Sequence, residues 1–217
     1  MKIARKKTIK EWINLVGDEK EPKINYISNE KWDEVFDFFE ERIRTRYINP
    51  IHVILNLKDN LGEGFAIVNL QCSLIETVEC FINGLIFQYP NFIMPSGVIL
   101  KKGSKGVFES FFKKREPFNT MDIDGSDFYK SVRCGLLHET QTKNGWKTLA
   151  QGCDKSIENK IIYRNDFQLD IEKVIENYKK AIVHGIELNQ IPTYELRENF
   201  IYKFNNICKT SLSDGNI

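Results

Sequence analysis

The sequence contains few of the residues that build turns. Its 217 positions include only 13 Gly and 6 Pro, a smaller combined share than the roughly 12% that is usual in soluble proteins. Little of the chain is therefore available for turns, which favours long helices over a many-stranded sandwich. Hydrophobic residues make up 41% of the chain and include 15 Phe, so the chain can fill a core and is not globally disordered. The length allows one domain, or one domain with a small appendage.

Histidine is scarce, and neither sign of charge is in excess. The histidines are His52, His138 and His184, so a proton shuttle that works near neutral pH has three candidates. His52 and His184 have no second metal-type ligand at helical spacing and are assigned no function. The 31 basic and 30 acidic residues give a formal net charge of +1, which argues against a highly basic nucleic-acid coat.

Cysteine motifs and targeting segments are also missing. The 5 Cys are odd in number and show no CxxC or CxxxC spacing, which argues against a disulfide framework and against a zinc site. No apolar run follows the basic start MKIARKKTIKEW, so it does not resemble a secretory signal. The most apolar long stretch, 65–87, is interrupted by Asn, Gln and Glu, whereas a membrane span needs about 20 predominantly apolar residues. We expect a soluble cytoplasmic protein with no metal and no cofactor.

Apolar residues recur every three to four positions through most of the chain, which indicates amphipathic helices. Two short segments rich in β-branched and aromatic residues, 145–149 and 160–164, indicate strands. The sequence therefore predicts a mainly α fold, a helical bundle with a small β-hairpin at about 145–164 before the last two helices. We expect an N-terminal arm at 1–28, one domain at 29–209 and a flexible tail at 210–217. Helices are predicted at 29–47, 65–87, from Ser104, at 127–138, from Asp170 and after Pro192.

The most informative segment is FYKSVRCGLLHE, residues 128–139. An α-helix advances about 100° per residue, which places Val132 and its neighbours on a buried face. Arg133 then lies about 100° to one side of that face, and His138 about 120° to the other. Either the helix ends near 135–138, or Glu139 returns to the core as a partly buried carboxylate with a partner.

Arginine and histidine together suit one chemistry that needs no metal. An imidazole exchanges protons near neutrality, and a guanidinium holds phosphate oxygens and stabilises a phosphoryl transition state. Because RNA supplies its own nucleophile, the 2′-hydroxyl, such a site can cleave RNA by transesterification. Since Arg133 and His138 point apart in one chain, a two-fold dimer would bring two of each around one phosphate. The spacing alone also allows ordinary roles, an arginine paired with a surface acid and a hydrogen-bonded histidine at a helix end.

The block Arg133-Cys-Gly-Leu-Leu-His138 resembles the R-x4-6-H motif of the HEPN superfamily, helical RNA- and nucleotide-associated proteins found in bacterial toxin and defence systems. The order of elements is also similar, with a long apolar helix followed by the motif near the end of a second core helix. The resemblance implies a homodimeric, metal-independent endoribonuclease in which Arg133 and His138 are catalytic. Two positions depart from the family: Cys134 stands where active relatives often carry Asn, Asp or His. Thr140 stands where one toxin subclass has a modified Tyr.

Further residues are candidates for supporting roles. Glu76, in the long apolar helix, could orient Arg133 or His138, although an ordinary hydrogen-bonded acid is equally consistent with its position. Lys143 could contact a phosphate, and Trp146 could stack on a base. A turn lysine and a core tryptophan are the alternative interpretations of these two residues.

A cluster of basic residues, Lys113, Lys114 and Arg115, follows phenylalanines in the helix that begins near Ser104. It could bind an RNA backbone, or it could be the favourable positive end of an amphipathic helix. The series Asp122, Asp124 and Asp127 differs from a calcium loop because its Gly is misplaced and its twelfth position is Arg133.

Two functions remain open at this level. The first is a HEPN-type endoribonuclease that acts as a toxin or antiphage-defence effector. It would cleave tRNA or mRNA and be controlled by an antitoxin or defence-system partner. The second is a HEPN-like dimer that binds nucleotide, RNA or protein without cleaving. The Arg and His of the motif favour the first, and Cys134 together with the small net charge leaves room for the second.

Overall fold

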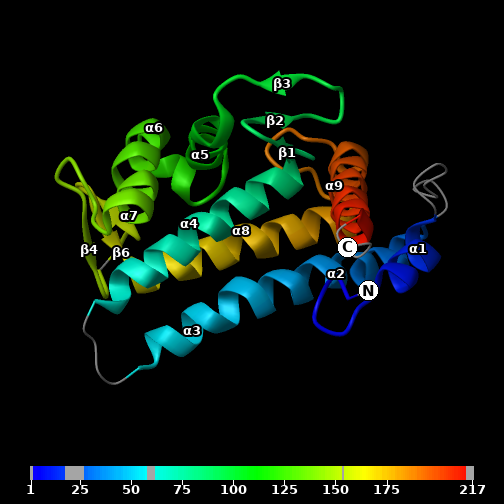
Figure 1. Ribbon diagram of the computed structural model, residues 1–217, viewed down its shortest axis with the longest axis horizontal. Coiled ribbons are helices and arrows are strands. Elements are labelled where there is room, and N and C mark those ends of the chain that lie inside the picture. Colours follow the sequence, from blue (N-terminus) through cyan, green and yellow to red (C-terminus); the bar gives the residue numbers. More distant parts are fainter. Residues whose placement is uncertain (1, 18–26, 58–61, 153, 214–217) are drawn as a thin grey trace. The chain divides into compact units, whose positions relative to one another are not determined.

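A computed structural model describes residues 2–17, 27–57, 62–152 and 154–213 of the chain (Figure 1). These residues form two compact units. Unit 1 comprises 1–46, 80–99 and 177–217, and unit 2 comprises 47–79 and 100–176. Helices dominate both units and the sheets are small, so the predicted mainly α fold is confirmed.

Unit 1 is built from helices that share an aromatic core. Its main helices are α1 (Ile9–Val16), α2 (Trp32–Ile43), the last residues of α8 (Arg164–His184), and α9 (Thr193–Ser213). A short 3-10 turn, η2 (Asn29–Lys31), leads into α2. The strands β1 (Ile86–Gln88) and β2 (Asn91–Ile93) pair antiparallel, and β3 (Ile99–Leu100) is the third strand of this sheet.

The core of unit 1 explains why the N-terminal residues fold. Trp12 of α1 is fully buried and stacks on Phe204, with ring centroids 4.3 Å apart. Its indole N–H donates to Asn205 Oδ1 at 2.7 Å. The side chain of Thr8 caps α1 together with Glu11, in a capping box. Part of the predicted arm is thus a helix packed on α9, while residues 18–26 lie outside the described residues.

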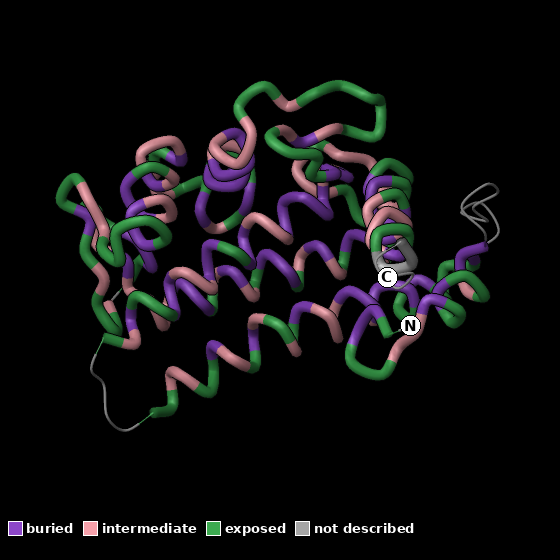
Figure 2. The backbone as a smooth tube through the Cα atoms, viewed as in Figure 1, coloured by how far each residue is buried: buried purple, intermediate pink, exposed green. Residues whose placement is uncertain are grey.

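Unit 2 contains the motif and most of the remaining elements. It includes α3 (Asn49–Leu55), most of α4 (Glu63–Ile82), α5 (Gly103–Lys114), η4 (Phe118–Thr120) and the first part of α8. The motif segment follows as α6 (Gly125–Phe128), η5 (Tyr129–Arg133) and α7 (Cys134–Glu139). Figure 2 shows buried residues recurring every three to four positions along α8, as the sequence pattern predicts. The core of unit 2 is a second ring cluster, Phe108, Phe111, Phe112, Phe118, Phe128, Trp146 and Phe167.

The second sheet differs in pairing from the prediction. Its strands are β4 (Lys147–Leu149), β5 (Ile157–Glu158) and β6 (Ile161–Tyr163). The hairpin is β5–β6, closed by Asn159 and Lys160, which both have positive φ as a two-residue hairpin turn requires. β4 runs parallel to β6. The segments 145–149 and 160–164, which we expect from the sequence to form a hairpin, are therefore parallel neighbours in the sheet.

Two helices also depart from the predicted ends. The helix predicted at 29–47 continues beyond its expected end, because a π-helical segment, η3 (Arg44–Ile48), runs directly into α3, whose second residue is Pro50. At the other end of the chain α9 extends to Ser213, so part of the predicted tail is helical, and 214–217 lie outside the described residues.

Within the described part of the chain, α4 alone is long and apolar enough to cross a membrane. However, 61% of its most apolar window is buried inside the protein. Its burial and the buried polar side chains of Gln71 and Glu79 within it are those of a core helix in a soluble protein.

Candidate functional site

The motif helix begins at a cap made by Asp124. Its carboxylate accepts hydrogen bonds from the backbone N–H of Ser126 at 2.8 Å and of Asp127 at 3.2 Å, which satisfies donors that the first turn leaves free. Gly125 follows because α6 crosses α5 closely. A Cβ at this position would lie 2.6 Å from the backbone carbonyl oxygen of Phe108. Only glycine therefore fits this crossing.

The centre of the motif helix is a π-helical turn. In η5 the backbone N–H of Cys134 donates to the carbonyl of Tyr129, five residues earlier. The helix then continues as α7 and ends at Thr140, which has a left-handed backbone with φ 56°. From there the chain folds back over Gly135, where a Cβ would lie 2.5 Å from the carbonyl oxygen of Gln141. Single-turn π segments occur often at functional sites.

Arg133 lies at the end of this π turn with its guanidinium partly open to solvent. Its Nη2 is 3.7 Å from Oε2 of Glu76 on α4, and the two side chains are 27% and 20% exposed. The guanidinium carbon also lies 5.8 Å from the centre of the Tyr129 ring. The other oxygen of Glu76 accepts a hydrogen bond of 2.9 Å from the hydroxyl of Ser104. Glu76 thus contacts Arg133 through a loose ion pair, and among the described residues the arginine keeps donors available for a ligand.

The groups around Arg133 stay neutral at physiological pH. Burial raises the pKa of the Tyr129 hydroxyl, as does its hydrogen bond with Cys134, while the Arg133 charge lowers it. Burial also raises the pKa of the Cys72 thiol on α4, and Arg133 partly opposes that shift. The Tyr129 hydroxyl and the Cys72 thiol are therefore neutral neighbours of the ion pair between Arg133 and Glu76.

His138 is exposed near the end of α7. Within the described residues no hydrogen bond or ion pair holds its imidazole. Glu139 is also exposed, and it pairs with Lys143, four residues later. Neither alternative for the helix end holds as stated: the helix runs one residue past 138, to Glu139, and that carboxylate is exposed on the surface with a lysine partner.

Within one chain Arg133 and His138 point in different directions. Arg133 and Cys134 both have α-helical backbone angles, so five residues of α-helix rotate His138 about 140° from Arg133 around the axis. One chain therefore presents the cation and the imidazole on two flanks of α7, with the half-exposed Leu137 beside the histidine.

The predicted RNA-binding role is wrong for two residues, Arg115 and Trp146. Arg115 is 1% exposed and donates to both carboxylate oxygens of Glu79, at 2.7 Å from Nε and 3.1 Å from Nη2. It is a buried structural arginine and cannot reach RNA. Trp146 is buried too, with its ring edge-on to Phe128 at 5.2 Å and its N–H donating to Asp127. It is a core tryptophan, 6% exposed, and its N–H is already bound.

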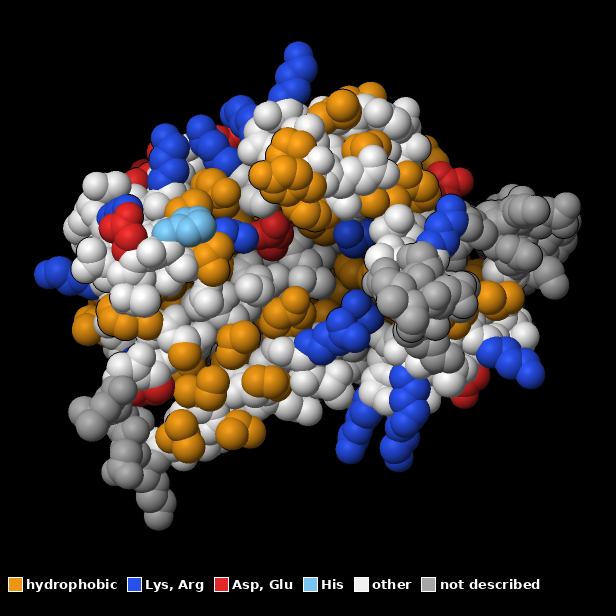
Figure 3. All heavy atoms as spheres, viewed as in Figure 1, with side chains coloured by type: hydrophobic (Ala, Val, Ile, Leu, Met, Phe, Trp, Pro, Cys, Tyr) orange, Lys and Arg blue, Asp and Glu red, His pale blue; other side chains and the backbone are white. Residues whose placement is uncertain are grey.

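The two other residues of the basic cluster are on the surface. Lys113 and Lys114 are exposed at the end of α5. Figure 3 shows Lys and Arg side chains gathered over α5 and α6 of unit 2. Lys102 and Lys105, at the start of α5, both pair with Glu109, so part of the positive charge there is balanced.

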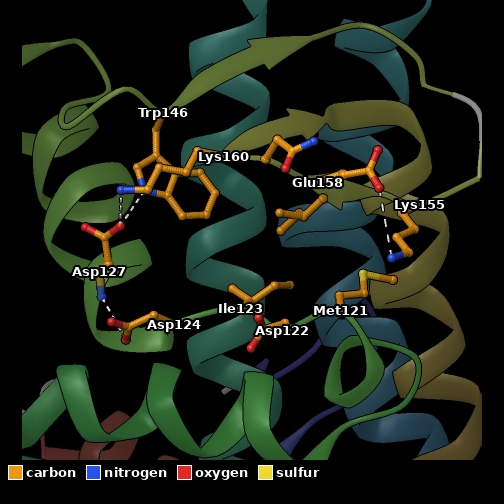
Figure 4. Close-up of a pocket in the computed structure, with 11 residues that line it drawn as sticks. Met121, Asp122, Ile123, Asp124, Asp127, Trp146, Lys155, Glu158 and Lys160 are labelled. Atoms are coloured by element: carbon orange, nitrogen blue, oxygen red, sulfur yellow. Dashed lines mark hydrogen bonds and ion pairs between the residues drawn. The ribbon is translucent and has the colours of Figure 1, made fainter.

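The hollows beside the motif helix lie on its Asp124 side. One, of about 350 Å³, is lined by Asp122, Asp124, Trp146 and the β5–β6 turn (Figure 4). A second, of about 410 Å³, lies between the same loop and α5. Neither is lined by Arg133 or His138. In the described part of the chain no group of three or more His, Cys, Asp or Glu is placed to hold a metal ion.

Comparisons of the chain with protein-family models, with curated proteins and with solved structures find no match. The function of the site must therefore be argued from the residues that form it. The sequence analysis brought out Arg133, His138 and Glu76, but it missed Tyr129 and Ser104 as neighbours of that pair. The four-residue spacing between Tyr129 and Arg133 was the one available signal, since residues four apart on a helix are neighbours.

Proposed function

We propose that this protein is a metal-independent endoribonuclease of the HEPN type, with Arg133 and His138 as its catalytic residues. The observation that carries the proposal is the availability of these two groups. The guanidinium has only a loose 3.7 Å ion pair with Glu76, and the imidazole is exposed without a partner among the described residues. The segment 133–138 resembles the HEPN motif, and this resemblance supports the same assignment.

The chemistry assigns a role to each group. His138 takes the proton of a ribose 2′-hydroxyl, whose oxygen attacks the adjacent phosphorus while the bond from phosphorus to the 5′ oxygen breaks. The imidazole of a second copy donates a proton to that leaving oxygen. Arg133 binds the non-bridging phosphate oxygens, whose negative charge grows in the transition state. The products are a 2′,3′-cyclic phosphate and a 5′-hydroxyl.

The active form in this proposal is a homodimer. The angle of about 140° between Arg133 and His138 around α7 keeps one protomer from bringing both to one phosphate from the same flank. Two copies related by a two-fold axis supply an Arg133 and a His138 from opposite sides. The half-exposed Leu137 next to His138 gives the apolar contact such an interface needs.

The proposal also covers setting and partners. We place the protein in the cytoplasm, since Cys72, Cys134 and Cys208 are free thiols. Its substrate is tRNA or mRNA, and it acts as a toxin or antiphage-defence effector under the control of an antitoxin or defence-system partner. Lys113 and Lys114 are the surface residues best suited to an RNA backbone, while Lys143 and Glu139, which pair with each other, flank the site.

The test is incubation of the purified protein with cellular RNA in EDTA, followed by analysis of the product ends. We expect 2′,3′-cyclic phosphate ends, loss of cleavage in Arg133→Ala, and partial activity in Arg133→Lys, which keeps the charge but loses the planar fork. Mixing inactive Arg133→Ala with inactive His138→Ala should restore only weak cleavage, because a mixed dimer retains one Arg133 and one His138 but lacks the second imidazole that protonates the leaving oxygen. Equal cleavage by all these proteins would overturn the catalytic assignment.

A dimer that binds without cleaving is the alternative that the same experiment detects. In that case RNA remains intact with the wild-type protein, and Arg133→Ala weakens binding of a labelled oligoribonucleotide. A monomer by light scattering would contradict the two-copy site in both versions.

A further inference from the structure

Asp127, whose side chain is 25% exposed, lies at the centre of a hydrogen-bonded network near the start of the motif helix. One carboxylate oxygen, Oδ1, accepts from the hydroxyl of Ser131 at 2.7 Å. The other, Oδ2, accepts from the indole N–H of Trp146 at 3.0 Å and pairs with Nζ of Lys160 at 2.8 Å. Figure 4 shows Trp146 and Lys160 converging on Asp127 from the loop and the hairpin.

The same network includes the loop that follows the motif. Asn144 donates from its side chain to the Ser131 hydroxyl at 2.8 Å, and the backbone N–H of Lys143 donates to the Ser131 carbonyl at 2.8 Å. Lys160 also donates to the carbonyl of Asn144 at 3.3 Å. The loop after α7 is therefore attached to Ser131, and the β5–β6 turn is attached to Asp127 and to that loop.

Ser131 is fully buried in the middle of the π segment, two positions before Arg133. Its hydroxyl and its carbonyl are each bound from outside the helix, so the backbone there is fixed by contacts with distant segments. A π turn is less stable than an α turn and persists where its surroundings determine it. The network around Asp127 supplies those surroundings.

We propose that Asp127 is a positioning residue, which acts through Ser131 to hold the π turn and so sets the direction in which Arg133 leaves the helix. The inference rests on the proposed ribonuclease function for its catalytic consequence. It also gives the β5–β6 hairpin a role: Lys160 binds the Asp127 carboxylate, so the hairpin helps to hold the π turn in place.

Electrostatics support this arrangement. The hydrogen bonds from Lys160, Ser131 and Trp146 lower the pKa of Asp127 to about 2. The carboxylate is therefore charged at every pH at which the protein would work, and its hydrogen bonds are of the stronger, charge-assisted kind.

The test compares Asp127→Asn, Ser131→Ala and Lys160→Met with a control, Glu158→Gln, which removes a charge on the same hairpin outside the network. Three quantities are measured on folded protein: the ¹⁵N–¹H signal of Arg133 Nε, amide exchange of Cys134, and kcat and KM for RNA cleavage. We expect a shifted Arg133 signal and about tenfold faster exchange of Cys134, whose N–H makes the π-type bond. We also expect kcat to fall about 10- to 100-fold while KM changes little.

Each outcome decides the inference. An unchanged Arg133 signal with unchanged Cys134 exchange in folded Asp127→Asn would overturn it. If Asp127→Asn does not fold, Ser131→Ala and Lys160→Met, which each remove one contact, decide in the same way. If the wild-type protein does not cleave RNA, the ribonuclease proposal fails, while the signal and the exchange rate still test the positioning role.

Discussion

Arg115 donates hydrogen bonds to both carboxylate oxygens of Glu79, and both side chains are buried inside unit 2. The hydroxyl of Ser110 donates to the same carboxylate at 2.6 Å. Glu76, one turn earlier on α4, contacts a second arginine, Arg133, but only through a loose and partly exposed pair. The two arginines thus differ in role: Arg115 is part of the core, and Arg133 is part of the candidate site.

The buried pair should be costly to break from one side. We expect Arg115→Met or Glu79→Gln to lower the free energy of unfolding by about 3–5 kcal/mol, because each leaves a buried polar partner uncompensated. The double substitution Glu79→Leu with Arg115→Met should cost less than the sum of the two single changes. Urea denaturation measures both effects. A loss below about 1 kcal/mol in the single variants would show that the pair does not hold α4 to α5.

The N-terminal helix should be an integral part of unit 1. Trp12→Ala removes a fully buried indole from the Phe204 contact, and we expect a loss of about 3–5 kcal/mol in stability. Ile13→Ala, at an exposed position on the same helix, is the matched control and should change stability by less than about 0.5 kcal/mol. Equal effects of the two substitutions would mean that α1 does not pack on the core.

Thiol reactivity should separate the cysteines by burial. Burial raises the pKa of Cys208 to about 12 and raises that of Cys72 as well, so neither forms an appreciable amount of thiolate at pH 8. Cys134 is half-buried beside Arg133 and is more accessible. With Cys153 replaced by Ser, maleimide should label Cys134 first in the folded protein. Labelling of Cys72 at the same rate would contradict its buried position.

Stability should depend on Asp127 in a defined range of acid pH. Its pKa is lowered from 3.8 to about 2, so its contribution is fully present above the unfolded value and is lost as the pH falls towards 2. We expect the stability difference between the wild type and Asp127→Asn to be largest above about pH 4 and to shrink below it. Thermal unfolding between pH 2 and pH 7 measures it. A difference that stays constant across this range would rule out a charged Asp127 as the source.

Local patterns predicted much of the fold and the solvent-exposed half of the site. Helical periodicity located α2, α4, α5, α8 and α9, and the spacing of Arg133 and His138 on either side of a buried face follows from the helix alone. The α1 helix was missed because its short amphipathic stretch lies in a polar segment, and its stability depends on Trp12 meeting α9 almost two hundred residues later.

What the sequence could not indicate depends on partners far along the chain. Arg115 resembles the exposed lysines before it, and only the facing Glu79 makes it a core residue. Trp146 is buried because Phe128 and Asp127 meet it from another element. The parallel pairing of β4 with β6 and the π turn at Tyr129–Arg133 have no periodic signature in the sequence. The π turn is held by contacts with a later segment, such as those of Asn144 and Lys143 with Ser131.

The rate of RNA cleavage by His138→Ala, relative to wild type and to His184→Ala in the presence of EDTA, tests the central claim most directly. His184 is an exposed histidine in unit 1 with no assigned role, which makes it the matched control. We predict that His138→Ala lowers kcat about 10²- to 10⁴-fold, the range for loss of a general acid–base group, while His184→Ala cleaves as fast as wild type. Undiminished cleavage by His138→Ala would contradict the account.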